Sequence, residues 1–274
     1  MPELSIVIVH HQTSELLNLC LKSFIYGYHK TMDREITVVD STISRKARDL
    51  IQENYPEIKY LPFKENLGYA RGVNIGIQNS SGKYILILNP DVIATNGAIE
   101  KMADYMEKHP DIGMLGPQVL NFNGSHQRTF FSYYNPATIL ARRSFLGRFG
   151  RFKKALNEFL MTDANPSQIQ TPDWLMGSAI MVRREALNKI GGMDERFFMY
   201  FEDVDWARRF WHNDYKVVFY PEAMMYHYHQ RESVSGLGLL DAIFNKKTRW
   251  HIASAIKFFW KYRNLQNIQT AKKI

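Results

Sequence analysis

Short apolar runs alternate with amphipathic stretches along the first part of the chain. Leu4–Val9 is a continuous, β-branched run of the kind that forms a strand buried on both faces. From Thr13 and Glu15 to about Tyr26, apolar residues recur on one helical face. The alternation continues with expected strands at 36–39, 58–61 and 84–88 and expected helices at 44–54, 67–78 and 95–108. This order predicts an α/β fold with a mostly parallel sheet and helices on its faces.

The second half of the chain has fewer recognisable elements. Residues 173–184 are typical of a turn that leads into a strand, and residues 216–220 predict a strand that Pro221 follows. From Leu239 to Arg263 the spacing of apolar residues predicts a helix. No motif stands out between Phe122 and Gln170, which we expect to be a variable loop or a helical insert.

Charge is distributed unevenly along the chain. Thirty-five Lys and Arg face 27 Asp and Glu, a formal net charge of +8. Eight basic residues and no acidic one lie between Ala242 and Ile274, and six more lie in the linker-like, acid-free stretch from Arg142 to Lys154. The remainder is net acidic, which excludes a uniformly basic nucleic-acid binder and predicts an acidic body with two basic attachments.

The amino-acid composition limits the domain organisation and the cellular compartment. With 45% hydrophobic and 14% aromatic residues, the chain can build one large α/β domain with an appendage, or two small domains. The single cysteine, Cys20, cannot form an intramolecular disulfide, which fits a reducing compartment. No apolar run reaches the roughly 18 residues of a membrane-spanning helix, and the acidic start MPELSIVIVHH lacks the basic region of a signal peptide. We therefore expect a soluble, cytoplasmic protein.

Polar residues follow three of the expected strands, where parallel sheets place their binding sites. They are His10 and His11, then Asp40 with its neighbours, then the segment from Asn89 to Asp91. A carboxylate at such a position can accept the imide N–H of a pyrimidine base, or hold a divalent cation beside a diphosphate. Each one taken alone could instead be a helix cap or a turn aspartate.

Gly68, Gly72 and Gly76 recur at every fourth position in the segment 65–77. On a helix they would share one smooth face that allows close backbone packing. The spacing does not match a dinucleotide fingerprint, and no Gly-Lys-Ser/Thr of a P-loop follows. Arg71, near the expected helix start, could meet a pyrophosphate or form a surface ion pair.

Three carboxylates lie within four positions in the segment 191–209: Glu202, Asp203 and Asp205. On a helix they fan over more than one face, so at most two can serve one pocket. One could be a general base, and the alternative for each is a solvated helix start. Farther along, His227 could join Asp91 in a mixed N/O metal site, or be a lone histidine with its hydrogen bonds satisfied.

These segments together resemble the family 2 glycosyltransferases of the GT-A fold, most closely their bacterial rhamnosyltransferase branch. The resemblance implies a Rossmann-like, mostly parallel sheet with a C-terminal helical extension, and ArgTrpHis at 249–251 resembles the tail of the same branch. The matching segments, in family order, are LSIVIV (4–9), VVDS (38–41), ENLGYARGVNIG (65–76), LNPDV (88–92), WLMGSAIMVRR (174–184), GGMDERFFMYFEDVDW (191–206) and PEAMMYH (221–227).

The resemblance implies a division of the chain. Residues 1–238 would form the GT-A domain, and 239–274 a basic amphipathic helical tail. Within the domain, 1–120 would bind the nucleotide sugar, 121–170 would be a variable insert, and 171–238 would carry the acceptor and catalytic half.

The same resemblance implies roles for individual residues. Asp40 matches the aspartate that contacts the nucleotide base, and Asn89 and Asp91 occupy the Asp-x-Asp position, with Asp91 as the metal-binding carboxylate. Asn89 replaces the first carboxylate, which should weaken metal binding. His227 matches the histidine that completes the metal shell, and Asp203 the catalytic base.

Further residues complete the implied site. Arg71 is expected at the donor's diphosphate, while Trp174, Gly177 and Glu202 are expected to bound the donor sugar and the acceptor. The implied cofactor is Mg²⁺ or Mn²⁺.

The implied activity is inverting transfer of L-rhamnose from dTDP-rhamnose to a polyprenyl-diphosphate-linked saccharide in bacterial cell-surface polysaccharide synthesis. A UDP-hexose-dependent galactosyl- or glucosyltransferase is the alternative within the class. A non-catalytic sugar-nucleotide-binding scaffold would lack the base and metal ligands, whereas Asp91, Asp203 and His227 are all present. A nucleotidyltransferase would need a basic, glycine-rich triphosphate loop near the first strand, and HisHisGlnThrSer lacks that chemistry.

The sequence of the tail is compatible with two environments for its predicted helix. Ile252, Ile256 and Phe259 lie at helical spacing, and Trp250, Phe258 and Trp260 add aromatic surface to a stretch that also carries lysines and arginines. This composition suits a helix in the interface of an anionic membrane, which would make the protein peripheral on the inner face of the cell membrane. The same composition suits a helix packed on the catalytic domain with a solvated basic face.

Overall fold

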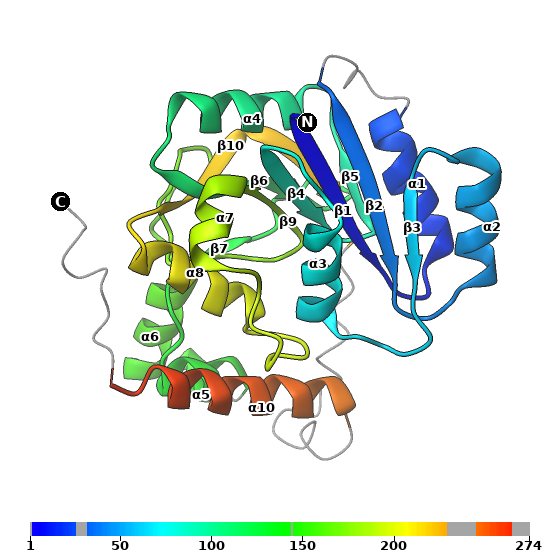
Figure 1. Ribbon diagram of the computed structural model, residues 1–274. Helices are drawn as coiled ribbons and strands as arrows, with labels where there is room; N and C mark the ends of the chain where they lie inside the picture. Colours follow the sequence, from blue (N-terminus) through cyan, green and yellow to red (C-terminus); the bar gives the residue numbers. More distant parts are fainter. Residues whose placement is uncertain (1, 26–31, 144, 229–244, 265–274) are drawn as a thin grey trace.

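The computed structural model describes residues 2–25, 32–143, 145–228 and 245–264. Its centre is an eight-stranded mixed sheet in the order β3-β2-β1-β4-β9-β6-β10-β5, accompanied by a two-stranded β7-β8 ribbon (Figure 1). The strands are β1 Leu4–His10, β2 Arg34–Asp40, β3 Lys59–Pro62, β4 Tyr84–Leu88, β5 Val92–Ala94, β6 Ile112–Leu120, β7 Phe130–Phe131, β8 Trp174–Leu175, β9 Ala179–Arg183 and β10 Lys216–His227.

Helices cover both faces of this sheet (Figure 1). They are α1 Ser14–Ile25, α2 Arg45–Asn54, α3 Tyr69–Gln78, α4 Ala98–Lys108, α5 Pro136–Arg143, α6 Gly150–Leu160, α7 Arg184–Ile190, α8 Glu202–His212 and α10 Lys246–Lys261, with a 3₁₀ turn, η1, at Phe145–Arg148.

The strands and helices expected up to residue 108 are all present, and the structure differs from the expectation in three places. Pro221 does not end the strand that begins at Lys216, because a register shift between Tyr220 and Met224 carries β10 on to His227. The basic stretch 142–154 is not a linker, since it lies in α5, η1 and α6. Strands β5 and β6 had no clear sequence signal. Residues 239–244 of the predicted tail helix lie outside the described part.

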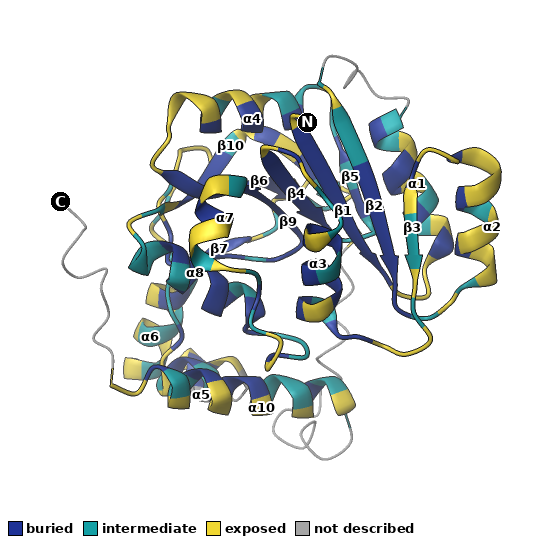
Figure 2. Ribbon diagram, viewed as in Figure 1, coloured by how far each residue is buried: buried dark blue, intermediate teal, exposed yellow. Residues whose placement is uncertain are grey.

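Alternate side chains of β1 enter two separate cores, which explains its continuous apolar run. Ile6 and Ile8 pack with α1, α2 and α4, whereas Val7 and Val9 pack with α3 and the second half of the chain. All seven residues of β1 are buried (Figure 2). The strand therefore lies at the centre of the molecule, with its polar carboxyl end at the edge of the sheet.

The glycine face predicted for 65–77 exists for two of its three members. Gly72 and Gly76 lie against Val9 and Val7, and a Cβ at Gly72 would approach within 2.8 Å of the Val9 side chain. Gly68 instead precedes α3 with a φ of +74°, and a Cβ there would lie 2.5 Å from the Phe198 carbonyl oxygen. Close approach of α3 to β1 thus depends on the two helical glycines.

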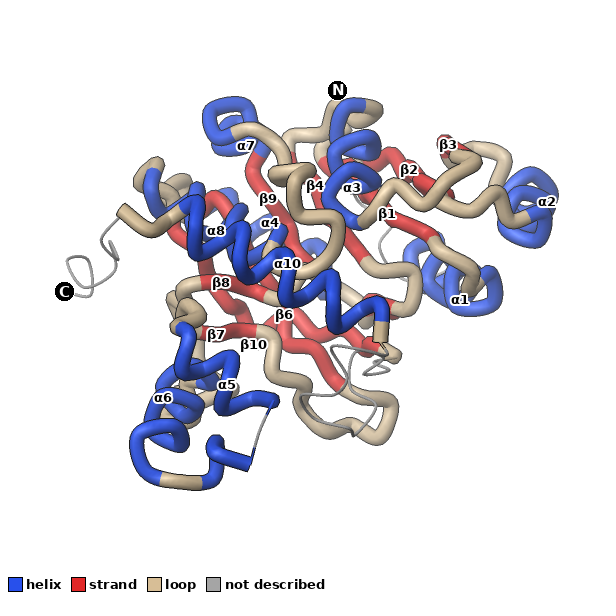
Figure 3. The backbone as a smooth tube through the Cα atoms, turned by 90° about the horizontal axis from the view of Figure 1, so that it is seen from below, coloured by secondary structure: helices blue, strands red, loops and turns tan. Residues whose placement is uncertain are grey.

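Helix α10 packs its inner face on the body of the molecule. Ala255, Phe258 and Tyr262 join the second core, whereas Ile256 and Trp260 are 65% and 64% exposed. Seen from below, α10 runs across the molecule, with α5 and α6 on the same side (Figure 3). Among the described residues, no helix combines the length and apolar character needed to cross a membrane.

Candidate active site

The carboxyl ends of β1, β2 and β4 meet at one edge of the sheet, as parallel strands require. His10, at the end of β1, is paired in register with Asp40 at the end of β2. Asn89 and Asp91 follow β4 at the same edge, and His227 ends β10. The sheet topology therefore places the polar residues predicted from the sequence at the same end of the sheet.

Asp40 is completely buried and its carboxylate is fully engaged inside the protein. Oδ1 accepts from the backbone and hydroxyl of Thr42 at 3.1 Å and lies 3.2 Å from His10 Nδ1, and Oδ2 accepts from Ser44 N at 2.9 Å and Tyr60 Oη at 2.5 Å. Burial raises the pKa of the carboxyl, but the hydrogen bonds from His10, Tyr60 and Ser44 outweigh burial and hold that pKa well below its usual range.

The resemblance predicts that Asp40 contacts the nucleotide base, and in the described conformation both of its carboxylate oxygens already accept hydrogen bonds. A pyrimidine imide would have to displace one of the donors that already hold it. In the described conformation Asp40 organises the turn between β2 and α2, where Ser44 caps α2.

Asp91 and His227 face one another, as the sequence suggested. His227 Nε2 lies 3.3 Å from Asp91 Oδ1, with the two side chains 4% and 21% exposed. On its other side, His227 Nδ1 lies 2.9 Å from Gln127 Oε1. Gln127 Nε2 donates to the His227 carbonyl at 2.8 Å and to Asn121 Oδ1 at 2.8 Å. If Nδ1 carries the proton donated to Gln127, the lone pair of Nε2 is directed at Asp91.

These residues fit a divalent cation held by few protein ligands. A carboxylate oxygen and an imidazole nitrogen 3.3 Å apart can share one ion, with substrate oxygens and water supplying the rest. Within the described ranges, no cluster of three or more His, Cys, Asp or Glu forms a complete metal cage. Asn89 is half-buried beside them, and its backbone N–H donates to the Ser178 carbonyl at 2.9 Å.

Glu202 and Asp203 begin α8 beside Gly177 and Tyr69. The Gly177 N–H donates to Asp203 Oδ2 at 3.0 Å, and the Val204 N–H donates to Asp203 Oδ1 at 2.9 Å. Tyr69 Oη donates to the Gly177 carbonyl at 2.5 Å. Gly177 thus links α3 to the start of α8 through its two backbone groups, which is a more specific position than the boundary role we expected.

The carboxylates at the start of α8 have raised pKa values. Burial raises the pKa of Asp203 to about 6, although the N–H groups of Gly177 and Val204 oppose the shift. Burial, and then the charge of Asp203, raise the pKa of Glu202 well above its usual range. Both carboxyl groups therefore favour the protonated form more than exposed carboxyl groups do, and the pKa of Asp203 lies close to neutral pH. A half-buried, ionised carboxylate with this pKa is suited to general-base chemistry.

The Tyr69 phenol is under the electrostatic influence of both this pair and Asp91. Burial, and then the charges of Glu202, Asp203 and Asp91 in that order, raise the pKa of the Tyr69 phenol well above its usual range. Three carboxylates from two distant segments thus act on one buried hydroxyl. Nothing in the sequence singles out Tyr69, which lies inside the glycine-containing segment and has the appearance of a core aromatic.

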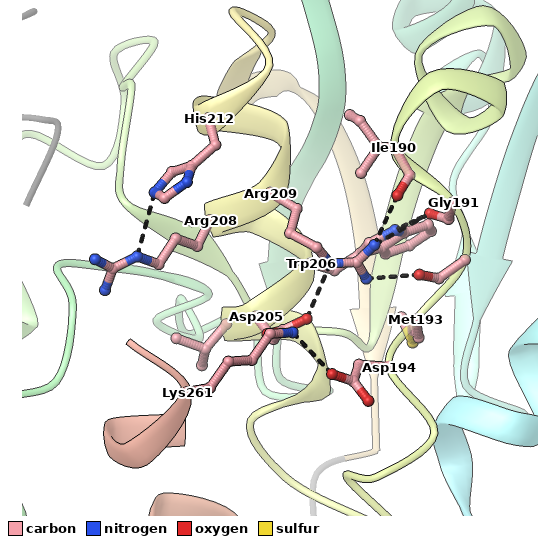
Figure 4. Close-up of polar contacts among 12 residues, drawn as sticks. Ile190, Gly191, Met193, Asp194, Asp205, Trp206, Arg208, Arg209, His212 and Lys261 are labelled. Carbon is pink, nitrogen blue, oxygen red and sulfur yellow. Dashed lines mark hydrogen bonds and ion pairs between the residues drawn. The ribbon is translucent and has the colours of Figure 1, made fainter. Parts of the chain in front are cut away.

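Asp205 points away from the pair, as expected for three carboxylates that fan around a helix. It is completely buried, with Lys261 Nζ at 2.5 Å, Tyr262 Oη at 2.8 Å and Arg209 Nε at 3.0 Å from its oxygens. Lys261 also reaches Asp194 at 2.8 Å (Figure 4). The α10 helix is thereby attached to the helix that carries Asp203.

Trp174 lies in the core, whereas Arg71 lies at the surface near the start of α3. Trp174 is 6% exposed, its ring stacks on Phe131 at 4.6 Å, and its N–H donates to the Ser132 carbonyl at 2.9 Å. In this conformation it packs in the core beside the site, and its expected place at the boundary of the donor sugar and acceptor stays a prediction. Arg71 is exposed, with Nη1 3.9 Å from Glu65 Oε1, and lies in the first turn of α3 without a buried partner among the contacts described.

Comparison with known proteins places these residues in a family context. A model of the family described as Glycosyl transferase family 2 matches residues 5–191, and one described as the N-terminal domain of galactosyltransferase matches residues 161–232. The chain is 27% identical over 255 residues to an N-acetylglucosaminyl-diphospho-decaprenol L-rhamnosyltransferase of Mycobacterium tuberculosis, covering 88% of this chain and 82% of that protein. It is 25% identical to a low-salt glycan biosynthesis hexosyltransferase of Haloferax volcanii, covering 76% and 61%.

Solved structures share the fold at low identity. A complex of GalNAc-T7 with UDP, GalNAc and Mn²⁺ superposes with a TM-score of 0.63 at 14% identity, covering 100% of this chain and 54% of that one. The mannosyltransferase PcManGT of Pyrobaculum calidifontis, in complex with GDP-Man and Mn²⁺, gives 0.57 at 12% identity, covering 98% and 77%. The chain therefore spans about half of the first protein's length. These likenesses confirm the predicted fold class.

Proposed function

The chain belongs to glycosyl transferase family 2, and from this membership we propose that it is an inverting transferase of L-rhamnose from dTDP-rhamnose to a saccharide carried on polyprenyl diphosphate. The mycobacterial relative, which covers most of both chains, supports this donor and acceptor. The observation that carries the proposal is the pairing of Asp91 with His227, 3.3 Å apart, together with an Asp203 carboxylate held by the N–H groups of Gly177 and Val204. We further propose that the product belongs to bacterial cell-surface polysaccharide.

In the proposed reaction, Asp203 acts as the general base. Its carboxylate takes the proton of an acceptor hydroxyl while that oxygen attacks the anomeric carbon from the face opposite the diphosphate. The bond to the diphosphate oxygen breaks as the new glycosidic bond forms, so the anomeric configuration inverts. The Gly177 and Val204 N–H groups fix the Asp203 carboxylate during this step. Burial raises the pKa of Glu202 well above its usual range, which favours its neutral form and limits the charge beside the base.

Asp91 and His227 are the residues that would hold a divalent cation, Mg²⁺ or Mn²⁺. When bound, such an ion neutralises charge on the departing diphosphate. Arg71 in the first turn of α3 is the proposed second partner of that diphosphate. Asn89 stands where the family pattern has a carboxylate, which leaves Asp91 as the charged metal ligand of this segment. Metal binding by this segment therefore depends mainly on Asp91.

Replacing Gln127 with Ala tests the orientation of His227. Loss of an outer-shell partner of a metal-binding histidine typically lowers metal affinity about 10- to 100-fold. We expect Mn²⁺ binding, measured by calorimetry in the presence of dTDP, to weaken by that factor in Gln127→Ala. Asn123→Ala, in the same turn but bonded to Ser125, is the matched control. Unchanged Mn²⁺ affinity in Gln127→Ala would remove Gln127 from the site.

We also propose that the outer face of α10 contacts an anionic bilayer that carries the lipid-linked acceptor. Ile256 and Trp260 are exposed on this face, and Arg249 and Lys257 are exposed on the same helix. The basic segment of α5, η1 and α6 lies on the same side of the molecule (Figure 3). Basic residues near such a surface contribute about 1 kcal/mol each. The sequence left two alternatives for the tail, a helix packed on the catalytic domain and a helix at a membrane surface. One helix can do both, with its inner face on the protein and its outer face on the lipid.

Serine at both Ile256 and Trp260 should weaken vesicle binding. Burying a large apolar side chain contributes about 1.5–3 kcal/mol, so binding to phosphatidylglycerol vesicles should fall at least about tenfold. Flotation with vesicles measures this directly. Leu19→Ser, on α1 and 47% exposed, is the control for loss of an exposed apolar residue. Equal flotation of the double variant and the parent protein would count against this surface.

A UDP-hexose donor is the second candidate, which the Haloferax volcanii hexosyltransferase relative favours. Calorimetry with dTDP, UDP, GDP and CDP, each with Mg²⁺ or Mn²⁺, distinguishes the donors. Preference for dTDP, followed by dTDP release from dTDP-rhamnose with N-acetylglucosaminyl diphosphate on a prenyl chain, supports the proposal. Preference for GDP would contradict pyrimidine recognition, and no nucleotide binding would favour a scaffold.

A further inference from the structure

The residues that lead into the catalytic pair adopt an unusual backbone conformation. Tyr200 and Phe201 both have a φ of +69°, and they immediately precede Glu202 and Asp203. Side-chain-bearing residues rarely occupy the left-handed region, and two in succession persist only where their surroundings hold them. The conformation of this turn sets the position at which α8, and with it Asp203, begins.

Helix α3 holds one side of this segment. The Tyr69 N–H donates to the Phe198 carbonyl at 2.9 Å, and Gly68 leaves the space that this carbonyl occupies. The same Tyr69 reaches Gly177 through its hydroxyl. This side of the segment is thus fixed by the family motif at 65–76.

Helix α10 holds the other side. Ser254 Oγ donates to the Met199 carbonyl at 3.0 Å. The His251 ring lies 5.1 Å from the ring of Tyr200 and 5.3 Å from that of Phe201, between centroids. Contacts from α10 therefore fall on three successive residues of the segment, including both in the left-handed conformation.

The buried ion pairs of Asp205 extend the contacts of α10 to helix α8 itself. Lys261 and Tyr262 both reach Asp205 Oδ1, and Lys261 also reaches Asp194, upstream of the turn (Figure 4). The Asp205 N–H donates to the Phe201 carbonyl at 2.9 Å. One lysine of α10 is thus bonded to both ends of the segment that contains the turn.

We propose that α10 is a positioning element of the active site, which holds the Tyr200–Phe201 turn and thereby orients Asp203. Lys261 and Tyr262 act on this turn through Asp205. Ser254 acts on it through Met199. This inference rests on the proposed role of Asp203 as the base. Its consequence is that the tail completes the catalytic site. Displacement of a reacting group by about 1 Å costs about 10²-fold in rate, so small movements of the turn have large effects.

Lys261→Met is the principal test. We expect a folded protein whose kcat for dTDP release from dTDP-rhamnose falls at least about tenfold while KM for the donor stays within about twofold. Hydrogen exchange at the Asp205 amide should accelerate in the absence of any substrate. Lys261→Arg, which keeps the charge, should restore most of kcat. The control is Lys216→Met, which breaks an exposed pair with Asp111 of 2.6 Å.

Ser254→Ala removes only one hydrogen bond and keeps the inference testable should Lys261→Met fail to fold. It should also lower kcat without changing the donor KM and accelerate exchange at 199–205. Parental kcat in both variants, or parental exchange at these amides, would overturn the inference. Hydrogen exchange does not depend on the donor. If the parent protein releases no nucleotide but the variants still loosen this segment, the proposed function fails while the positioning role stands.

Discussion

Asp203→Asn should lower kcat by about two to four orders of magnitude, the usual contribution of a positioned general base. Asparagine has almost the same shape and keeps one acceptor oxygen, so it can retain one of the two backbone hydrogen bonds from Gly177 and Val204. What it cannot do is accept the acceptor's proton. Measuring dTDP release with saturating donor and acceptor separates this loss from weaker binding.

The pH profile gives the same prediction a second readout. A base acts only when ionised, and burial raises the pKa of Asp203 to about 6. In the parent protein kcat/KM should therefore rise with pH and level off above about pH 6, where an ordinary aspartate with a pKa of about 3.9 would level off near pH 4. This limb should disappear from the residual activity of Asp203→Asn.

Unchanged dTDP binding is the control for Asp203→Asn, because the nucleotide is expected at the ends of β1, β2 and β4. If the folded variant retained near-parental turnover, Asp203 would not be the base. Glu202 would then be the candidate to test, since it is the neighbouring buried carboxyl.

The first half of the fold was predictable because each element buries a simple pattern. In β1 the alternating isoleucines and valines enter two cores, so the strand is apolar or small at every position before its terminal His10. β6 and β5 were missed for different physical reasons. β6 contains Gly113, Gly116 and Pro117, which weaken any strand signal, and β5 is only three residues long.

The candidate site was predictable where the type of side chain alone indicates a role, as it does for metal-binding carboxylates and histidines. Asp91 and His227 were paired in the prediction, and the structure brings them within 3.3 Å. Gln127, Tyr69 and Lys261 were not predictable, because an amide, a phenol and a surface-type lysine acquire their roles only through distant neighbours. Trp174 shows the converse, since its aromatic ring was placed at the ligand and lies in the core.

Asp91→Asn should lower kcat/KM by at least about two orders of magnitude. A cation that neutralises a leaving diphosphate contributes several kcal/mol, and each 1.36 kcal/mol corresponds to a factor of ten in rate. Asn89 has already replaced one carboxylate of this segment, so Asp91→Asn would leave His227 with only neutral neighbours from it. The loss should appear as weaker Mn²⁺ binding, and excess Mn²⁺ should recover part of the activity.

Chelation gives the matching loss in the parent protein. EDTA should remove the activity and Mg²⁺ or Mn²⁺ should restore it, whereas Asp91→Asn should respond little to EDTA because it already binds the ion weakly. Asp111→Asn, an exposed carboxylate paired with Lys216, controls for the loss of one negative charge and should behave as the parent does. Full activity of the parent in EDTA, together with full activity of Asp91→Asn, would show that the diphosphate departs without an ion. Charge neutralisation would then have to come from basic side chains, with Arg71 at the start of α3 as the first residue to replace.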